Sequence, residues 1–201
     1  MTDASGKPQG REAQRLRTRD RVLDAAVAEF ARTGSADADI TAIVEAAGVA
    51  RGTFYFHFPT KEHVLLELER REETLLAQKL SRFLRTEHDL RAALAETIRL
   101  VLALERRLGA VLFRELLAVH FSPTRSPDNP REFPMIALVS DEITHARDRG
   151  EARDTVDPDH AALFFLLGLY ALLTTTPDNK TARDAVLDSY LTTALHSMEA
   201  R

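Results

Sequence analysis

The amino-acid sequence predicts an all-α protein, with a three-helix helix-turn-helix domain at the N-terminus and a larger helical domain after it. Apolar residues recur at spacings of three and four along most of the 201-residue chain, which is the helical period. Glycine and proline fall mainly where these periodic segments stop. Between Ile40 and Phe58, two short helical patterns are joined by a tight turn at residues 47–49.

The composition is that of a soluble globular protein, with 44% hydrophobic and 29% charged residues. The absence of cysteine excludes disulfide bonds and thiolate metal sites, and it fits a reducing cytoplasm. The seven histidines show no metal-ligand spacing with acidic residues, so we expect neither a metal nor a cofactor. The longest apolar run, residues 161–173, is shorter than the about 20 residues that cross a bilayer. The polar N-terminus lacks a signal-peptide core, and we expect no membrane partner.

Residues 1–10 contain Gly, Pro, Ser and Gln without an apolar period, and we expect a disordered tail there. The net charge of −4 argues against a generally basic surface, but residues 1–21 carry a net charge of +3. Six basic groups produce this excess: Lys7, Arg11, Arg15, Arg17, Arg19 and Arg21. A local basic arm matters more for nucleic-acid binding than the total charge. An idle tail and an arm that follows DNA phosphates are both open readings.

The first helix is expected over Arg11 to Arg32. Four apolar residues between Leu23 and Phe30 fall at i, i+3, i+4 and i+7, and Gly34 is placed to end the helix. The arginines near its start oppose the helix dipole, so they do not stabilise the helix itself. Phosphate contact and a solvated face are equally open explanations for them.

The next two helices form the helix-turn-helix. Asp39 can cap the helix that begins at Ile40, and Gly48 supplies the turn because positive φ costs a glycine little. The second helix is expected over Arg51 to His57.

At about 100° per residue, Phe54 and Phe58 share one side of this second helix and must be the buried side. The other side and its edges carry Arg51, Gly52, Thr53, Tyr55, Phe56 and His57. These side chains can hydrogen-bond phosphates and base edges, or touch a thymine methyl group. For Phe56, contact with thymine and packing on a neighbouring helix are both open. The pattern predicts a helix that lies in the DNA major groove.

This stretch resembles the DNA-binding domain of the TetR (tetracycline repressor) family over roughly Arg19 to Leu66. The resemblance is carried by Ala46-Ala47-Gly48-Val49, by Gly52-Thr53-Phe54-Tyr55-Phe56-His57-Phe58 and by Lys61-Glu62. It implies a homodimer that binds a double-stranded DNA operator, with a DNA-binding domain at 11–60 and a ligand-sensing and dimerisation domain at 61–201. It also implies DNA contacts by Thr41, Arg51, Gly52, Thr53, Tyr55, Phe56, His57 and Lys61.

The sequence departs from the family pattern at three positions. Asp39 stands where a threonine commonly caps the helix and touches phosphate, and a carboxylate there is repelled by DNA. Ala50 replaces the usual serine cap of the recognition helix, which leaves a backbone N–H without its side-chain partner. Val44 replaces a usual alanine, which bears on how closely the helices pack.

Helical patterns continue to the C-terminus. They are expected from Lys61 to about Leu84, from Asp89 to Leu108, from Ala110 to Phe121 and from Met135 to Arg149, followed by helices that begin after Asp157 and at Thr181. Four prolines explain the loop between Ser122 and Pro134, which is a plain connector or a lid. In the family, the helix that begins at Lys61 is the lever between ligand and DNA.

The last two helices are the candidate dimer interface. The helix over residues 161–173 is apolar on nearly every side, so we expect one side to face the core and the other a second subunit. The last helix has apolar residues in a coiled-coil-like order. The expected interface residues are Leu163, Leu167, Tyr170, Leu187, Leu191, Ala194 and Met198.

An effector pocket is expected among the helices between Leu90 and Tyr170. The candidates are Phe113, Arg114, Leu117, His120, Phe121, His145, Phe164 and Tyr170. Each has an alternative role, as a core residue for the apolar ones and as a surface pair for the charged ones. The family's effectors are mostly apolar or amphipathic small molecules.

The sequence therefore indicates a ligand-responsive repressor of the bacterial cytoplasm, associated with the nucleoid when bound. An activator, or a DNA-binding dimer without a small ligand, is the alternative. An enzyme would need a nucleophile–base set or a carboxylate pair, and the sequence offers neither above chance, nor any catalytic residue.

Overall fold

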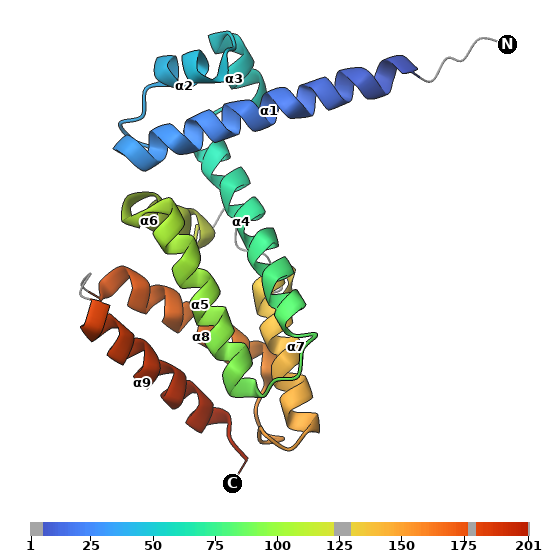
Figure 1. Cartoon of the computed structure of the whole chain (residues 1–201), viewed down its shortest axis with the longest axis vertical. Helices are drawn as coiled ribbons and strands as arrows, with labels where there is room; N and C mark the ends of the chain where they lie inside the picture. The colour runs from blue at the N-terminus through green and yellow to red at the C-terminus, as the bar shows by residue number, and fades with distance from the viewer. Residues whose placement is uncertain (1–5, 123–129, 177–179, 201) are drawn as a thin grey trace, which may run out of the picture. The chain divides into compact units, whose positions relative to one another are not determined.

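The computed structural model describes residues 6–122, 130–176 and 180–200. Within these ranges it contains nine α-helices, one short 3-10 helix and no strand, which confirms the all-α prediction (Figure 1). One isolated β-bridge joins Ala152 to Glu199.

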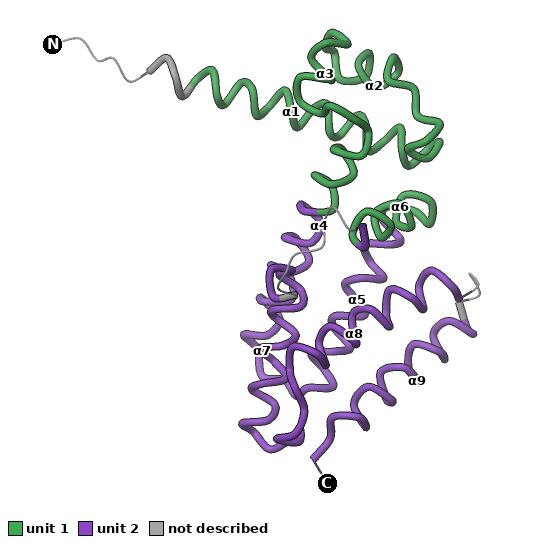
Figure 2. Tube along the Cα trace, turned by 180° about the vertical axis from the view of Figure 1, so that it is seen from behind, with its two compact units in different colours: residues 1–69, 108–120 green, residues 70–107, 121–201 purple. Residues whose placement is uncertain are grey.

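The chain divides into two compact units (Figure 2). Unit 1 comprises the chain up to Glu69 together with Leu108–His120, and unit 2 comprises the rest. Unit 1 holds α1 (Gly6–Thr33), α2 (Ile40–Ala47), α3 (Arg51–His57), the start of α4 (Lys61–Phe83) and α6 (Ala110–His120). Unit 2 holds the rest of α4, α5 (Leu90–Leu108), η1 (Pro130–Glu132), α7 (Pro134–Asp148), α8 (Pro158–Thr175) and α9 (Lys180–Met198). Helix α6 therefore groups with the N-terminal helices.

Helix α1 begins at Gly6, five residues before the expected start at Arg11. The expectation of a disordered tail is thus wrong for residues 6–10, while residues 1–5 lie outside the described part. A proline in the first turn of a helix does not break it, because the N–H that it lacks would have no partner there.

Local signals end and begin the helices of unit 1 as expected. Gly34, at φ 79°, closes α1, and its N–H donates to the carbonyl of Phe30 at 2.8 Å. The Asp39 carboxylate accepts the N–H of Thr41 at 2.8 Å, and Gly48 forms the turn at φ 62°. Ala50 precedes α3 without a side-chain cap.

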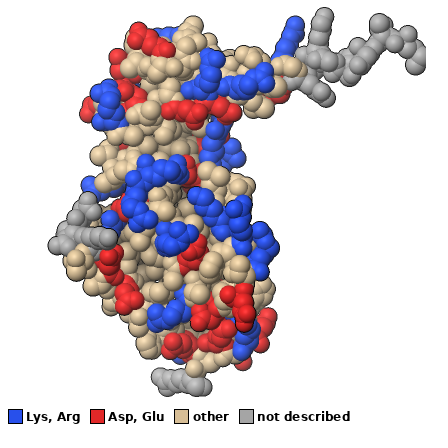
Figure 3. All heavy atoms as spheres, in the orientation of Figure 1, with Lys and Arg blue, Asp and Glu red and all other residues tan. Residues whose placement is uncertain are grey.

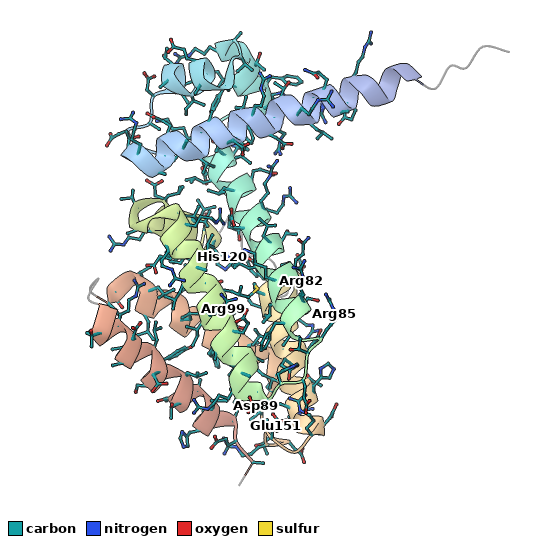
Figure 4. The ribbon with its side chains drawn as sticks, in the orientation of Figure 1. Arg82, Arg85, Asp89, Arg99, His120 and Glu151 are labelled. Atoms are coloured by element: carbon teal, nitrogen blue, oxygen red, sulfur yellow. The ribbon has the colours of Figure 1, made fainter. Side chains whose placement is uncertain are left out.

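Unit 2 is built around α7 and α8. The Asp157 carboxylate caps α8 by accepting the N–H of His160 at 2.9 Å. At the start of α5, the Leu90 N–H donates to the Glu151 carboxylate at 3.0 Å, and the Ala92 N–H donates to Asp89 at 2.7 Å (Figure 4). The contact with Glu151 joins the start of α5 to the loop after α7, and the contact with Asp89 caps the helix locally.

Helices α8 and α9 approach closely at Gly168. A Cβ atom on Gly168 would lie 2.6 Å from the hydroxyl oxygen of Tyr190, so the close approach requires glycine. The Tyr190 hydroxyl donates to the carbonyl of Phe165, and its ring stacks on the Phe165 ring at 5.6 Å. Burial raises the pKa of Tyr190 to about 12.

Helix α8 is, within the described ranges, the helix whose length and composition would allow it to cross a membrane. Core helices of soluble proteins meet the same criteria. Ala162, Phe165, Leu166 and Leu169 are at most 3% exposed, and α8 makes extensive contact with α7. We therefore interpret α8 as a core helix.

Candidate nucleic-acid interface

Helix α3 is held by two phenylalanines on its buried side. Phe54 is 0% exposed and Phe58 is 1% exposed, as the helical geometry predicted. Their ring centroids lie 6.3 Å apart, and the Phe54 ring meets the Tyr55 ring edge-on at 5.3 Å. Because both anchors are rigid aromatic groups, the orientation of α3 about its own axis is fixed.

The opposite side of α3 faces solvent. Arg51, Gly52, Tyr55 and Phe56 are exposed, while Thr53 and His57 are half-buried. Phe56 is 69% exposed, and its ring makes an edge contact with the His57 ring at 5.1 Å. This exposure disfavours packing of Phe56 on a neighbouring helix. Nothing lies within 4 Å of where a Gly52 Cβ would be, so the backbone is open to a close partner.

Two further predicted contacts lie beside α3. The Thr41 side chain is exposed at the start of α2. The Lys61 ammonium donates to the carbonyl of Ala36 at 2.9 Å, which ties the start of α4 to the loop between α1 and α2. Lys61 therefore has a structural partner that a phosphate contact would have to share or replace.

Two arginines of α1 have roles that the sequence reasoning missed. The Arg21 guanidinium donates to the carbonyl of Ala47 at 2.8 Å, where the end of α2 leaves acceptors without helical partners. Arg19 pairs with the buried Glu67 at 2.9 Å and lies over the Phe58 ring at 4.8 Å. Both arginines hold the helix-turn-helix onto α1. The arginine-rich start of α1 was the only signal in the sequence. It did not distinguish arginines that hold the helix-turn-helix onto α1 from arginines that contact DNA phosphates.

The end of α3 lies in a positive electrostatic environment. Burial lowers the pKa of His57, and the positive charges of Arg15 and Arg19 lower it further. His57 is consequently neutral near pH 7 and has a ring nitrogen available to accept or donate a hydrogen bond.

The predicted pocket residues are divided between the two units. Phe113 and Leu117 are buried in α6, and His120 pairs with Glu69 at 2.7 Å within unit 1 (Figure 4). In unit 2, the Phe121 and Tyr170 rings lie 6.0 Å apart. The remaining three candidates are exposed in the single chain: Arg114, His145 and Phe164. Exposed side chains do not enclose an effector, so these three are the weakest pocket candidates.

The expected dimer residues divide into two groups. Tyr170, Leu187, Leu191 and Met198 are 4–7% exposed, so they face the chain's own core. The coiled-coil-like order of α9 is therefore satisfied within the chain, and these four residues leave no surface for a second subunit. Leu167 is 39% exposed, while Leu163 and Ala194 are half-buried.

An apolar surface remains on the outer side of α8 and α9. Phe164 is 66% exposed and Val186 is 38% exposed. A groove of about 350 Å³ lies between the two helices. Its lining includes Phe164, Phe165, Tyr190, Thr193 and Ala194.

Residues 22–68 match the family model described as "Bacterial regulatory proteins, tetR family". Over 73 residues the chain is 41% identical to the transcriptional repressor KstR of Mycolicibacterium smegmatis. The aligned region covers 36% of this chain and 35% of that protein. Over 57 residues it is 35% identical to the probable acrEF/envCD operon repressor of Escherichia coli K12, covering 28% and 26%. The matches thus span about a third or less of each of these relatives.

Solved structures share the fold over most of the chain. RolR in complex with resorcinol aligns with a TM-score of 0.70 at 20% identity, covering 94% of this chain and 91% of that one. Thermus thermophilus FadR in complex with lauroyl-CoA aligns with a TM-score of 0.66 at 26% identity, covering 91% and 96%. The curated relatives are named as transcriptional repressors and regulators, and none as an enzyme. Residues 22–68 therefore form an N-terminal domain of the kind described for bacterial regulatory proteins of the tetR family.

Proposed function

We propose that this chain is a dimeric transcriptional repressor that binds a palindromic DNA operator through α3 and leaves it when a small effector binds. The observation that carries the proposal is the division of α3 into two sides. Phe54 and Phe58 are buried, and an exposed side of polar and aromatic groups is presented to solvent. This is the arrangement of a recognition helix in the major groove.

Each residue on this side of α3 has a role that suits DNA. Arg51 forks onto guanine or a phosphate, and Thr53 offers a hydroxyl and a methyl group to base edges. Tyr55 and His57 hydrogen-bond phosphates, and Phe56 covers a thymine methyl group. Gly52 lets the backbone approach closely, and Thr41 and Lys61 add phosphate contacts at the edge of the interface.

A palindromic operator requires two copies of α3 related by a two-fold axis, about 34–36 Å apart. The outer apolar surface of α8 and α9 supports such a dimer, because Phe164, Leu167 and Val186 would be removed from water there. We therefore propose the outer surface of the two helices as the dimer interface, with Leu163 and Ala194 at its margin.

The effector is proposed to be a small apolar or amphipathic molecule. RolR was solved with resorcinol, and the FadR of Thermus thermophilus with lauroyl-CoA, on the same fold. An activator, or a dimer without an effector, would use the same DNA interface. Release from the operator by a small ligand would distinguish the proposed repressor from these alternatives. The protein is proposed to act in the cytoplasm and to associate with the nucleoid when bound.

Selection of bound fragments from genomic DNA of the source organism tests the proposal. We expect enrichment of an inverted repeat near a promoter, with half-site centres about one helical turn apart, and a dimer by light scattering. A variant with Thr53→Ala and Tyr55→Phe should enrich nothing. A stable monomer, or enrichment no greater than that of random DNA, would contradict the proposal.

A further inference from the structure

The N-terminal half of α1 carries arginines that the packing of unit 1 does not use. Val22, Leu23, Ala26 and Phe30 are at most 2% exposed, whereas most side chains between Arg11 and Arg17 are exposed. At 1.5 Å per residue, the 28 residues of α1 extend about 42 Å. Figure 1 shows the helix running well past α3 toward the N-terminus. This projecting part contributes little to the core.

The side of α1 that carries the helix-turn-helix can be identified from two contacts. Arg21 reaches the carbonyl of Ala47, and Arg19 lies over the Phe58 ring. At about 100° per residue, Arg19 and Arg21 are about 160° apart around the helix, and buried Val22 lies between them. The helix-turn-helix therefore sits on the Val22 side of α1.

Arg11 and Arg15 lie on this same side. They precede Val22 by eleven and seven residues, which places both within about 20° of it around the helix. Along the axis they lie about 16 and 10 Å from Val22. They thus form a basic row that continues from the helix-turn-helix along its own side of α1, and Figure 3 shows basic side chains along this stretch.

The charge of this row reaches the recognition helix. Arg15 and Arg19 both lower the pKa of His57, after burial itself. The partner of Arg15 is Glu12 at 2.8 Å, and both side chains are 54% exposed. Such a surface pair is weak and can be exchanged for a phosphate. Arg11 makes no ion pair among the described residues, and its side chain is exposed.

We propose that Arg11 and Arg15 form a second DNA contact, a phosphate-binding row that follows the duplex backbone beside the half-site read by α3. The inference rests on the proposed function. The row contacts phosphates and carries no sequence information, so it strengthens binding to operator and random duplex alike. The contribution of the row to DNA affinity also depends on the presence of base pairs that flank the half-site.

The test measures DNA affinity of the full chain against salt concentration by fluorescence anisotropy. The variant Arg11→Gln with Arg15→Gln is compared with Arg82→Gln plus Arg85→Gln, two exposed arginines of α4 and the loop after it (Figure 4). Each lost phosphate contact should reduce the salt slope by about 0.9, which is roughly eightfold in affinity at 0.1 M salt. The control pair should keep the wild-type slope, and circular dichroism should show unchanged helicity in both variants.

The ratio of operator to random-duplex affinity should be unchanged in Arg11→Gln with Arg15→Gln. A duplex trimmed to the half-sites should weaken wild-type binding and leave this variant unaffected. An unchanged slope, or a loss confined to the operator, would overturn the phosphate row while leaving the role of α3 intact. If the wild-type chain does not prefer any duplex, the proposed function itself fails, and the row fails with it.

Discussion

Both carboxylate oxygens of Glu115 accept the backbone N–H of Ser35, at 2.9 and 3.0 Å. Ser35 follows the end of α1, and Glu115 lies 80 positions later in α6. The same loop receives Lys61 at the carbonyl of Ala36. The loop that leads into the helix-turn-helix is therefore held by one side chain from α6 and one from α4, so a change in either helix acts directly on its position.

Replacing Glu115 with alanine should destabilise the chain by about 1–3 kcal/mol, because the Ser35 N–H loses a charged acceptor. Urea unfolding measures the change, and hydrogen exchange should show faster exchange of the Ser35 amide. Glu62→Ala, which removes an exposed carboxylate from the first turn of α4, is the control. Equal stabilities and equal exchange in the two variants would show that the contact has no role.

The crossing of α8 and α9 is tested by Gly168→Ala. The new Cβ would lie 2.6 Å from the Tyr190 hydroxyl oxygen and 2.9 Å from its ring, so the tyrosine must move. We expect a loss of about 1–3 kcal/mol in the free energy of unfolding. Gly10→Ala is the matched change in an open helical position, where nothing lies within 4 Å, and should stabilise by about 0.5–1 kcal/mol. A neutral Gly168→Ala would refute the close crossing.

The DNA affinity should rise as the pH falls from 8 to 6. Burial, Arg15 and Arg19 lower the pKa of His57, so the free protein carries a neutral ring near pH 7. A nearby phosphate favours the protonated ring, so binding takes up a proton and strengthens at lower pH. Anisotropy titrations at several pH values measure this, and His57→Gln should flatten the profile. The same pH profile in wild type and His57→Gln would rule out a phosphate contact by this ring.

His88 should make the free energy of unfolding depend on pH. Burial lowers its pKa, but the hydrogen bond to the Thr86 carbonyl and the Glu142 carboxylate at 3.2 Å outweigh burial, and the pKa is raised. The stabilisation is thus complete below the unfolded pKa of about 6.5 and is lost as the pH rises through the folded value. The stability difference between wild type and His88→Gln should shrink from pH 6 to pH 8.5 in urea titrations. A difference that grows with pH would reverse the assignment.

Features fixed by neighbours in the chain were predictable from the sequence. Gly34 and Gly48 end helices because they tolerate positive φ, and Asp39 and Asp157 accept free N–H groups two or three residues ahead. The two sides of α3 followed from the spacing of Phe54 and Phe58. All of these signals act within about one helical turn.

Features that depend on distant partners were not predictable. The order of Leu187, Leu191 and Met198 shows that one side of α9 is buried, but not whether the partner is the same chain or another. Val111 fits an apolar stripe, yet it is 54% exposed. The placement of Arg21 on the end of α2 and of Glu115 on Ser35 depends on contacts 26 and 80 positions apart, which no local pattern encodes.

The central claim is that the exposed side of α3 reads DNA, and the affinity ratio between the selected operator duplex and a scrambled duplex tests it most directly. Arg51→Gln with Thr53→Ala, which removes the two side chains proposed to reach base edges, should lower this ratio at least tenfold, about 1.4 kcal/mol, with the fold retained. His145→Ala, an exposed histidine of α7, should leave the ratio at its wild-type value. If the α3 variant keeps both the wild-type ratio and the wild-type salt dependence, α3 is not the recognition helix.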